Sequence, residues 1–74
     1  MWHNNRTVVQ TYAHHTSEFA WANLDGGIGW KQLKNGAPDG VTNLFVMMNA
    51  AKANSRNVNV NIDDAGLITT AYLL

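Results

Sequence analysis

The chain has 74 residues and a formal net charge of zero, with five basic and five acidic side chains. A chain of this length forms one small domain over residues 1–74, which excludes multi-domain enzymes and cofactor-binding folds built from two halves. The balanced charge argues against a protein built mainly to hold nucleic acid or an anionic membrane, and the lack of cysteine excludes disulfides and thiolate metal sites.

The first part of the chain predicts two β-strands. Residues 1–6 are polar apart from Trp2, and we expect them to be a loosely held arm. The β-branched and aromatic side chains of Thr7–His14 favour a strand, and Glu18–Leu24 predicts the next one after a short polar break.

A turn at Asp25-Gly26-Gly27 connects the second strand to a third over Ile28–Leu33. Because side chains alternate along a strand, the loop length decides whether Trp21 and Trp30 share a face of the sheet. A two-residue loop places them on the same face and a three-residue loop on opposite faces. We favour the two-residue loop, and hence a shared face.

One helix is predicted over Val41–Asn54, with Asp39 as its N-cap. The side chains expected to face the core recur at helical spacing: Val41, Leu44, Phe45, Met48 and Ala51. The opposite side is unusually apolar, because Val46, Met47 and Ala50 lie there. We therefore expect both sides of this helix to be covered.

Two closing strands follow the helix. The first, Asn57–Ile62, alternates valine or isoleucine with asparagine, which predicts a half-buried strand. The second, Leu67–Leu74, is apolar on both faces. One face is expected to carry Ile68, Tyr72 and Leu74, and the other Leu67, Ala71 and Leu73. Both faces of this strand should therefore be covered.

The element order is three strands, one helix and two strands, which defines a mostly β, α+β fold. A five-stranded OB-type barrel has its helix between the third and fourth strands and fits this order. An open antiparallel sheet with one helix across it uses the same elements. Both forms of the β-β-β-α-β-β fold remain open at this point.

The composition also indicates self-association. A small domain without disulfides or metal often needs a partner chain for stability, and only 14% of the residues are charged, as in the cores of protein interfaces. We expect a homo-oligomer. The expected interface residues are Val46, Met47 and Ala50 of the helix and Leu67, Ala71 and Leu73 of the last strand.

Several short motifs resemble small uncharacterised bacterial proteins of the mobile gene-cassette type. They are the helix start Asp39-Gly40-Val41-Thr42-Asn43, the helix end Ala51-Lys52-Ala53-Asn54 and the closing pair of strands, within residues 28–74. In element order the chain is also similar to the OB-type B subunits of ring-forming bacterial toxins. That resemblance implies the architecture and a tendency to oligomerise, but no sugar-binding residue. A signal peptide and the disulfide common in such subunits are not seen in this sequence.

No residue pattern predicts catalysis. His14, His15 and Glu18 could hold a metal only if the chain bends, because adjacent strand residues point to opposite faces. Ser17 lacks a nucleophile elbow, and the glycines of the Gly26–Gly29 turn precede no helix that could bind phosphate. We therefore expect no enzyme activity, no cofactor and no metal site.

The aromatic side chains are the main candidates for ligand binding. We expect Trp21, Phe19 and Phe45 to supply the core or an interface, whereas Trp2 and Trp30 are free to stack on a ligand ring. Asparagine is a poor strand residue, so the alternating asparagines could hydrogen-bond sugar hydroxyls. The candidate ligand-binding residues are Trp2, Trp30, Asn57, Asn59 and Asn61.

These observations favour a non-enzymatic, self-assembling binding or interaction module, whose ligand is a neutral polar molecule such as a glycan. The alternative is a single-strand nucleic-acid-binding OB domain, for which Lys31, Lys34, Lys52 and Arg56 offer little phosphate attraction. A small metal-dependent enzyme using the histidines is the third alternative. Without an apolar run of membrane-spanning length or a signal peptide, we expect a cytoplasmic protein that does not bind membranes.

Overall fold

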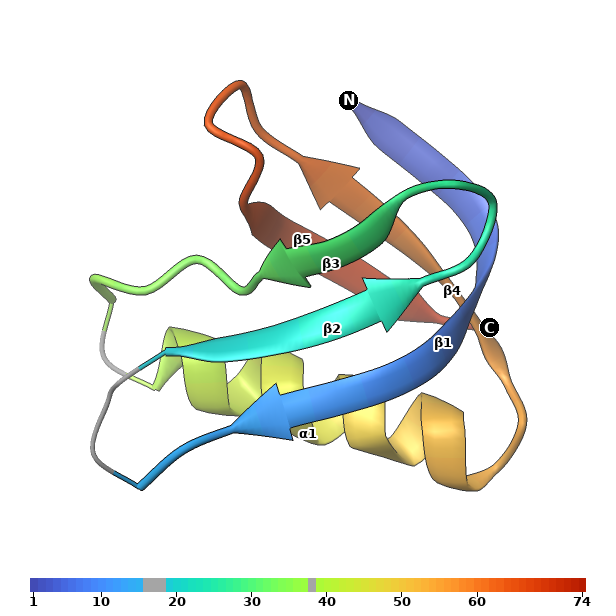
Figure 1. Ribbon diagram of the computed structural model, residues 1–74, viewed down its shortest axis with the longest axis horizontal. Helices are drawn as coiled ribbons and strands as arrows, with labels where there is room; N and C mark the ends of the chain where they lie inside the picture. The colour runs from blue at the N-terminus through green and yellow to red at the C-terminus, as the bar shows by residue number, and fades with distance from the viewer. Residues whose placement is uncertain (16–18, 38) are drawn as a thin grey trace.

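The computed structural model describes residues 1–15, 19–37 and 39–74 and has the element order β-β-β-α-β-β (Figure 1). The elements are β1 (Trp2–Ala13), β2 (Ala20–Leu24), β3 (Gly29–Gln32), α1 (Gly40–Ala53), β4 (Asn57–Ile62) and β5 (Ile68–Leu73). The predicted fold class is confirmed. The predicted start of the second strand, Glu18, lies outside the described residues.

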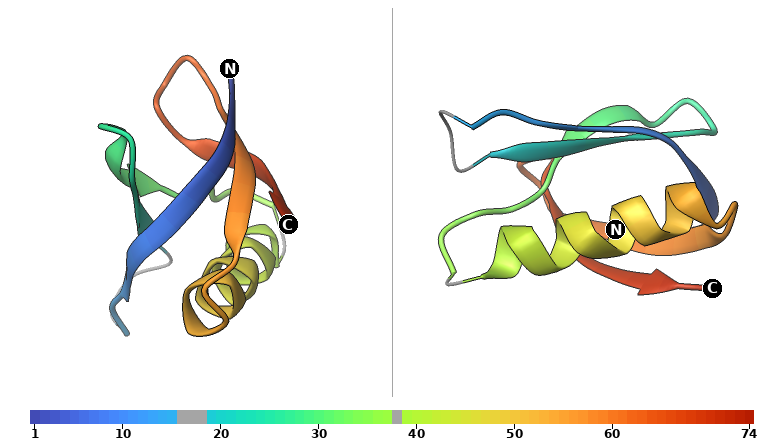
Figure 2. Two further views of the ribbon diagram at one scale, coloured as in Figure 1. Left: turned by 90° about the vertical axis from the view of Figure 1, so that its right-hand side faces the viewer. Right: turned by 90° about the horizontal axis from the view of Figure 1, so that it is seen from below.

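The five strands form one sheet in the order β3-β2-β1-β4-β5, with antiparallel neighbours. The long strand β1 pairs with β2 through its second half and with β4 through its first half, so the sheet folds around it into a half barrel (Figure 2). Within the described residues, the outer strands β3 and β5 are joined just after β3, where Leu33 bridges Ile68 and Lys34 N donates to Ile68 O at 2.9 Å. The topology is therefore OB-like, but the sheet is not closed into a barrel.

Helix α1 lies across one end of the half barrel and contributes Met48 and Ala51 to the core (Figures 1 and 2). The rest of the buried core comes from the sheet: Val8, Ala20, Ala22, Leu24, Leu33, Val58, Val60, Ile62, Ile68 and Ala71. The predicted helix face is confirmed, since its three other members pack against this core. Met47 packs there too, although we expected it on the opposite side. No helix in the described ranges is both long and apolar enough to cross a membrane.

Asp39 precedes α1 as predicted, but it does not cap the helix with its side chain. Its backbone is left-handed, with φ of 61°, and its carboxylate makes no capping hydrogen bond. Asp39 O instead accepts from Asn43 N at 2.9 Å. The helix therefore begins on backbone interactions alone.

Residues 1–6 are not a loose arm, because most of them belong to β1. Trp2 and His3 pair with Asn61 and Val60 of β4, and Met1 O accepts from Ile62 N at 2.9 Å. A bulge follows in β1, where the register shifts between His3 and Arg6. This pairing extends β1 well beyond its predicted start at Thr7.

The β2–β3 connection confirms one prediction and corrects another. Asn23 pairs with Trp30, so Trp30 lies on the same face as Trp21, as expected. The connection itself spans the four residues 25–28 rather than two. Loops of two and of four residues both place Trp21 and Trp30 on the same face, because side chains alternate along a strand. The face was therefore predicted correctly although the predicted loop length was wrong.

The alternation predicted for the last strand is confirmed for Ala71 and Leu73, which share a face opposite Tyr72, but it is wrong for Ile68. The pairing of β5 with β4 shifts register, so that Ile68 lies opposite Ile62 while Ala71 lies opposite Val60. Both Ile68 and Ala71 consequently point into the core. An irregularity of this kind lets side chains three residues apart share a face, which strict alternation forbids.

Candidate functional site

The candidate site lies on the outer face of the sheet, which we define as the face opposite the core side chains. On β1, β2 and β3 it carries Gln10, Tyr12, Trp21, Asn23, Trp30 and Gln32. On the other half of the sheet it carries Trp2, Asn57, Asn59, Asn61, Thr70 and Tyr72. None of these side chains is charged, so polarity on this face comes from amides, hydroxyls and indole N–H groups.

Tyr12, Trp21 and Trp30 line a shallow hollow of about 320 Å³ on this face, and we call these residues the aromatic face. Tyr12 lies directly opposite Trp21, with ring centroids 5.4 Å apart and planes inclined by 55°. Phe19 lies beside Trp21, with a centroid distance of 6.3 Å. Tyr12 and Trp30 remain about half exposed, so their rings are accessible to a ligand.

A neutral polar rim adjoins the aromatic face. Asn23 pairs with Trp30 across the sheet, and its Nδ2 donates to Gln10 Oε1 at 3.2 Å. Gln32 lies opposite Trp21 on the same face. Aromatic rings beside amide groups suit a ligand that has an apolar ring face and an edge of hydroxyl or amide groups.

Trp21 and Phe19 are not part of the core, so of the two expected roles, core or interface, the core role is wrong for both. The inward side chains of β2 are Ala20, Ala22 and Leu24, and Ala22 lies opposite Thr11 of β1. Thr11 Oγ1 donates to Asn49 Oδ1 of α1 at 2.6 Å, so the helix approaches this part of the sheet closely. The inward side chains nearest this contact, Ala20 and Ala22, are small, and the large rings lie on the outer face.

Asn57, Asn59 and Asn61 all hold β1 in place. Asn59 Oδ1 accepts from Asn5 N at 2.7 Å, and Asn61 Oδ1 accepts from Met1 N at 2.9 Å. Asn57 donates from Nδ2 to Asn5 Oδ1 at 2.8 Å and accepts from Thr7 Oγ1. The two bonds to Asn5 lie where the bulge interrupts the β1–β4 backbone pairing, so the side chains of Asn57 and Asn59 replace missing backbone partners there, whereas the bond of Asn61 holds the start of the chain.

The structure divides the predicted ligand-binding set. Trp2 lies near the asparagines, where it pairs with Asn61 and stacks on Tyr72. Trp30 lies with Tyr12 and Trp21 on the other half of the sheet.

Tyr12 and Trp21 are the site residues that the sequence-based set lacks. The alternation of Trp21 with Ala22, and of Asn23 with Leu24, was the available signal, because it places the indole on the same face as a polar amide.

His14 and His15 follow β1, and their rings stack with centroids 4.8 Å apart. The chain does bend there, but Glu18 and Ser17 lie outside the described residues. Across residues 1–15, 19–37 and 39–74, no group of three or more His, Cys, Asp or Glu side chains is arranged to hold a metal ion. The described part of this segment thus adds no metal centre to the site.

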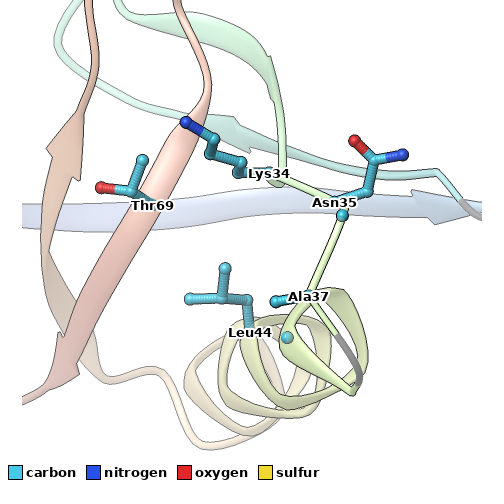
Figure 3. Close-up of a pocket in the computed structure, with 7 residues that line it drawn as sticks. Lys34, Asn35, Ala37, Leu44 and Thr69 are labelled. Atoms are coloured by element: carbon cyan, nitrogen blue, oxygen red, sulfur yellow. The ribbon is translucent and has the colours of Figure 1, made fainter.

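A second hollow, of about 410 Å³, lies between the loop after β3, the start of α1 and Thr69 of β5 (Figure 3). Lys34 is the charged residue in its lining, and Lys34 Nζ pairs with Asp63 Oδ2 at 3.2 Å. Leu44 and Ala37 supply apolar side chains on the helix side (Figure 3). Because Lys34 is already paired with Asp63, this hollow presents no unpaired charged side chain of its described lining to a ligand.

Comparisons with protein-family models, with curated proteins and with solved structures found no match to this chain.

Proposed function

We propose that the protein is a non-enzymatic binding module whose aromatic face takes a neutral glycan. The observation that carries this proposal is the hollow formed by Tyr12, Trp21 and Trp30 on a sheet face whose described side chains are all uncharged. A sugar ring presents an apolar face for stacking on an aromatic ring, and its hydroxyls are suited to the adjoining amides of Asn23 and Gln32.

None of the strand residues that the structure describes on this face is a cation, which favours a glycan over single-stranded nucleic acid. Proteins that bind single strands combine stacking aromatics with a positively charged groove along the phosphates. Lys31, the basic residue closest in sequence to Trp30, pairs with Ala22 and so points to the inner side of the sheet. A nucleotide chain stacked on the aromatic face would therefore gain no phosphate contact from Lys31.

Self-assembly is the second part of the proposal, and it rests on the exposed apolar side chains outside the aromatic face. Val46 of α1 is 63% exposed, and Leu73 at the edge of the sheet is 44% exposed. Ala71 is buried inside the chain and Met47 packs on its core, so Ala71 is not available to a second copy and Met47 only in part. Several copies in one assembly would raise the avidity of weak individual glycan sites.

A glycan array, followed by titration of the best oligosaccharide with tryptophan fluorescence, tests the proposal. We expect Trp30→Ala and Tyr12→Ala each to weaken binding about tenfold or more, because each removes a stacking ring. Trp2→Ala is the matched control, since Trp2 lies on the same face of the sheet but away from the hollow. We expect its affinity to remain that of the unmodified protein.

The array is run beside a panel of single-stranded oligonucleotides at low and high salt. Oligonucleotide binding that falls steeply with salt, without glycan binding, would replace the proposed function by the nucleic-acid alternative. Glycan binding that survives both Trp30→Ala and Tyr12→Ala would overturn the assignment of the aromatic face.

A further inference from the structure

The end of the half barrel opposite α1 is open and carries basic side chains. His3 and Arg6 of β1 and Lys31 of β3 line a hollow of about 380 Å³ there, beside the β2–β3 turn. These strand positions pair with Val60, Val58 and Ala22, all of them core residues, so they lie on the inner side of the sheet. The hollow is therefore separate from the aromatic face, which is on the outer side.

One donor of the Arg6 guanidinium is buried in this hollow without a hydrogen-bond acceptor. Its Nε is buried and makes no hydrogen bond. The neighbouring acid, Asp25, accepts from Thr7 N at 2.9 Å through Oδ1. Among the described residues, Lys34 and Asp63 form the ion pair within 4.0 Å, so Arg6 has no carboxylate partner there. A buried donor of a charged group without an acceptor is costly, and more so than an unpaired neutral donor.

Gly26 makes room for the guanidinium. Its φ is 71°, and a Cβ placed on it would collide with Arg6 Nη1. The turn thus lies directly against the guanidinium and confines it. Gly27 has a similar φ of 81°, but a Cβ there would meet nothing within 4 Å.

The geometry points to a second binding site at this open end, which takes an oxyanion of the phosphate class, as inorganic phosphate or as a phosphate ester. Arg6 offers a planar fork of donors that suits two oxygens of one anion, and Lys31 adds a positive charge. The described residues that line the hollow include no carboxylate but do include Ile28 and Ile62, and apolar walls strengthen the attraction between unlike charges.

The two arginines of the chain provide the measurement and its internal control. We expect the Nε–H groups of Arg6 and Arg56 to give separate signals in a ¹⁵N-correlated NMR spectrum, and Arg56 Nε already donates to Leu74 O at 2.8 Å. We titrate the full chain with sodium phosphate and with glycerol phosphate, each against sodium chloride at matched ionic strength. The Arg6 signal is expected to shift and saturate with phosphate while the Arg56 signal stays in place. Tighter binding of the ester than of inorganic phosphate would identify an ester as the preferred source.

Two pairs of matched variants test whether phosphate binds at this hollow. Lys31→Gln is expected to weaken phosphate binding about tenfold, whereas Lys52→Gln removes the same charge from an exposed site on α1 and should leave it unchanged. Gly26→Ala and Gly27→Ala impose similar backbone strain, but only Gly26→Ala displaces the guanidinium and should abolish the Arg6 shift.

Two results would overturn the site. One is an Arg6 signal that responds to phosphate no more than to chloride. The other is an equal loss of binding in Lys31→Gln and Lys52→Gln, which would show that phosphate only screens the overall charge.

Discussion

The indole of Trp2 stacks on the ring of Tyr72, with centroids 5.4 Å apart and planes inclined by only 11°. The two residues come from β1 and β5, which are not neighbours in the sheet, so the stack spans β4. Together with the asparagine hydrogen bonds from β4, it holds the first residues of β1 in the sheet. Trp2 is thus a structural aromatic residue, in contrast to Trp30.

We predict opposite behaviour for the variants of these tryptophans. Trp2→Ala is expected to lower the free energy of unfolding by about 1–2 kcal/mol, because it removes the stack and its buried area. Trp30→Ala removes a side chain of similar exposure that lines a hollow, and is expected to cost less. Urea denaturation of both variants measures the difference. An equal loss in the two variants would contradict the structural role of the Trp2–Tyr72 stack.

The hydrogen bond from Thr11 to Asn49 gives a second prediction. It joins β1 to α1 in a partly buried place, with an oxygen–oxygen distance of 2.6 Å. Thr11→Val keeps the shape of the side chain but leaves the Asn49 amide oxygen without its donor, and is expected to cost about 1–2 kcal/mol of stability. Thr70→Val on the exposed face of β5 serves as the control. The role of the bond is disproved if thermal unfolding shows the same midpoint for both variants.

The element order could be predicted from the sequence because each element carries a local signal. The alternation of Val58, Val60 and Ile62 gives β4 with the observed bounds, and the spacing of Leu44, Phe45 and Met48 gives the buried face of α1. These signals depend on neighbours in the chain, so they do not require knowledge of the tertiary structure.

The errors have tertiary causes. Residues 1–6 are held in the sheet by hydrogen bonds with asparagines on β4, a strand far away in the sequence: Asn59 and Asn61 accept, and Asn57 donates. Ile68 shares the inner face with Ala71 because the β4–β5 register shifts. Trp21 lies outside the core because the β1–β2 register turns Ala22 inward, opposite Thr11, and Trp21 outward, opposite Tyr12. The aromatic face was therefore only partly predictable, and the Arg6 hollow was not, because its residues come from separate strands.

Asp63 gives a prediction for pH dependence. The pKa of its carboxyl is lowered, first by the hydrogen bond from Leu67 N and also by Lys34 and by Ala65 N. A depressed pKa in the folded state stabilises the fold above the unfolded pKa of about 4, and this contribution is lost as the pH falls through the folded value. Asp63→Asn should therefore flatten the loss of stability below about pH 4, whereas Asp64→Asn should leave the profile steep. Thermal midpoints measured from acid to neutral pH check this, and parallel profiles for Asp63→Asn and the unmodified protein would contradict it.

Self-association is best tested at Val46. Its side chain is 63% exposed on α1, so Val46→Glu should abolish association without lowering the free energy of unfolding of the single chain. Met47→Glu is a poorer probe, because Met47 packs on the core and a charge there is expected to unfold the domain as well. Lys52→Gln changes the net charge by the same single unit and removes no large apolar side chain, so this control variant should remain associated.

Light scattering gives the mass of each protein in solution. If the unmodified protein is a monodisperse monomer, the exposed apolar side chain of Val46 is not covered by a second copy and the assembly part of the proposed function is wrong.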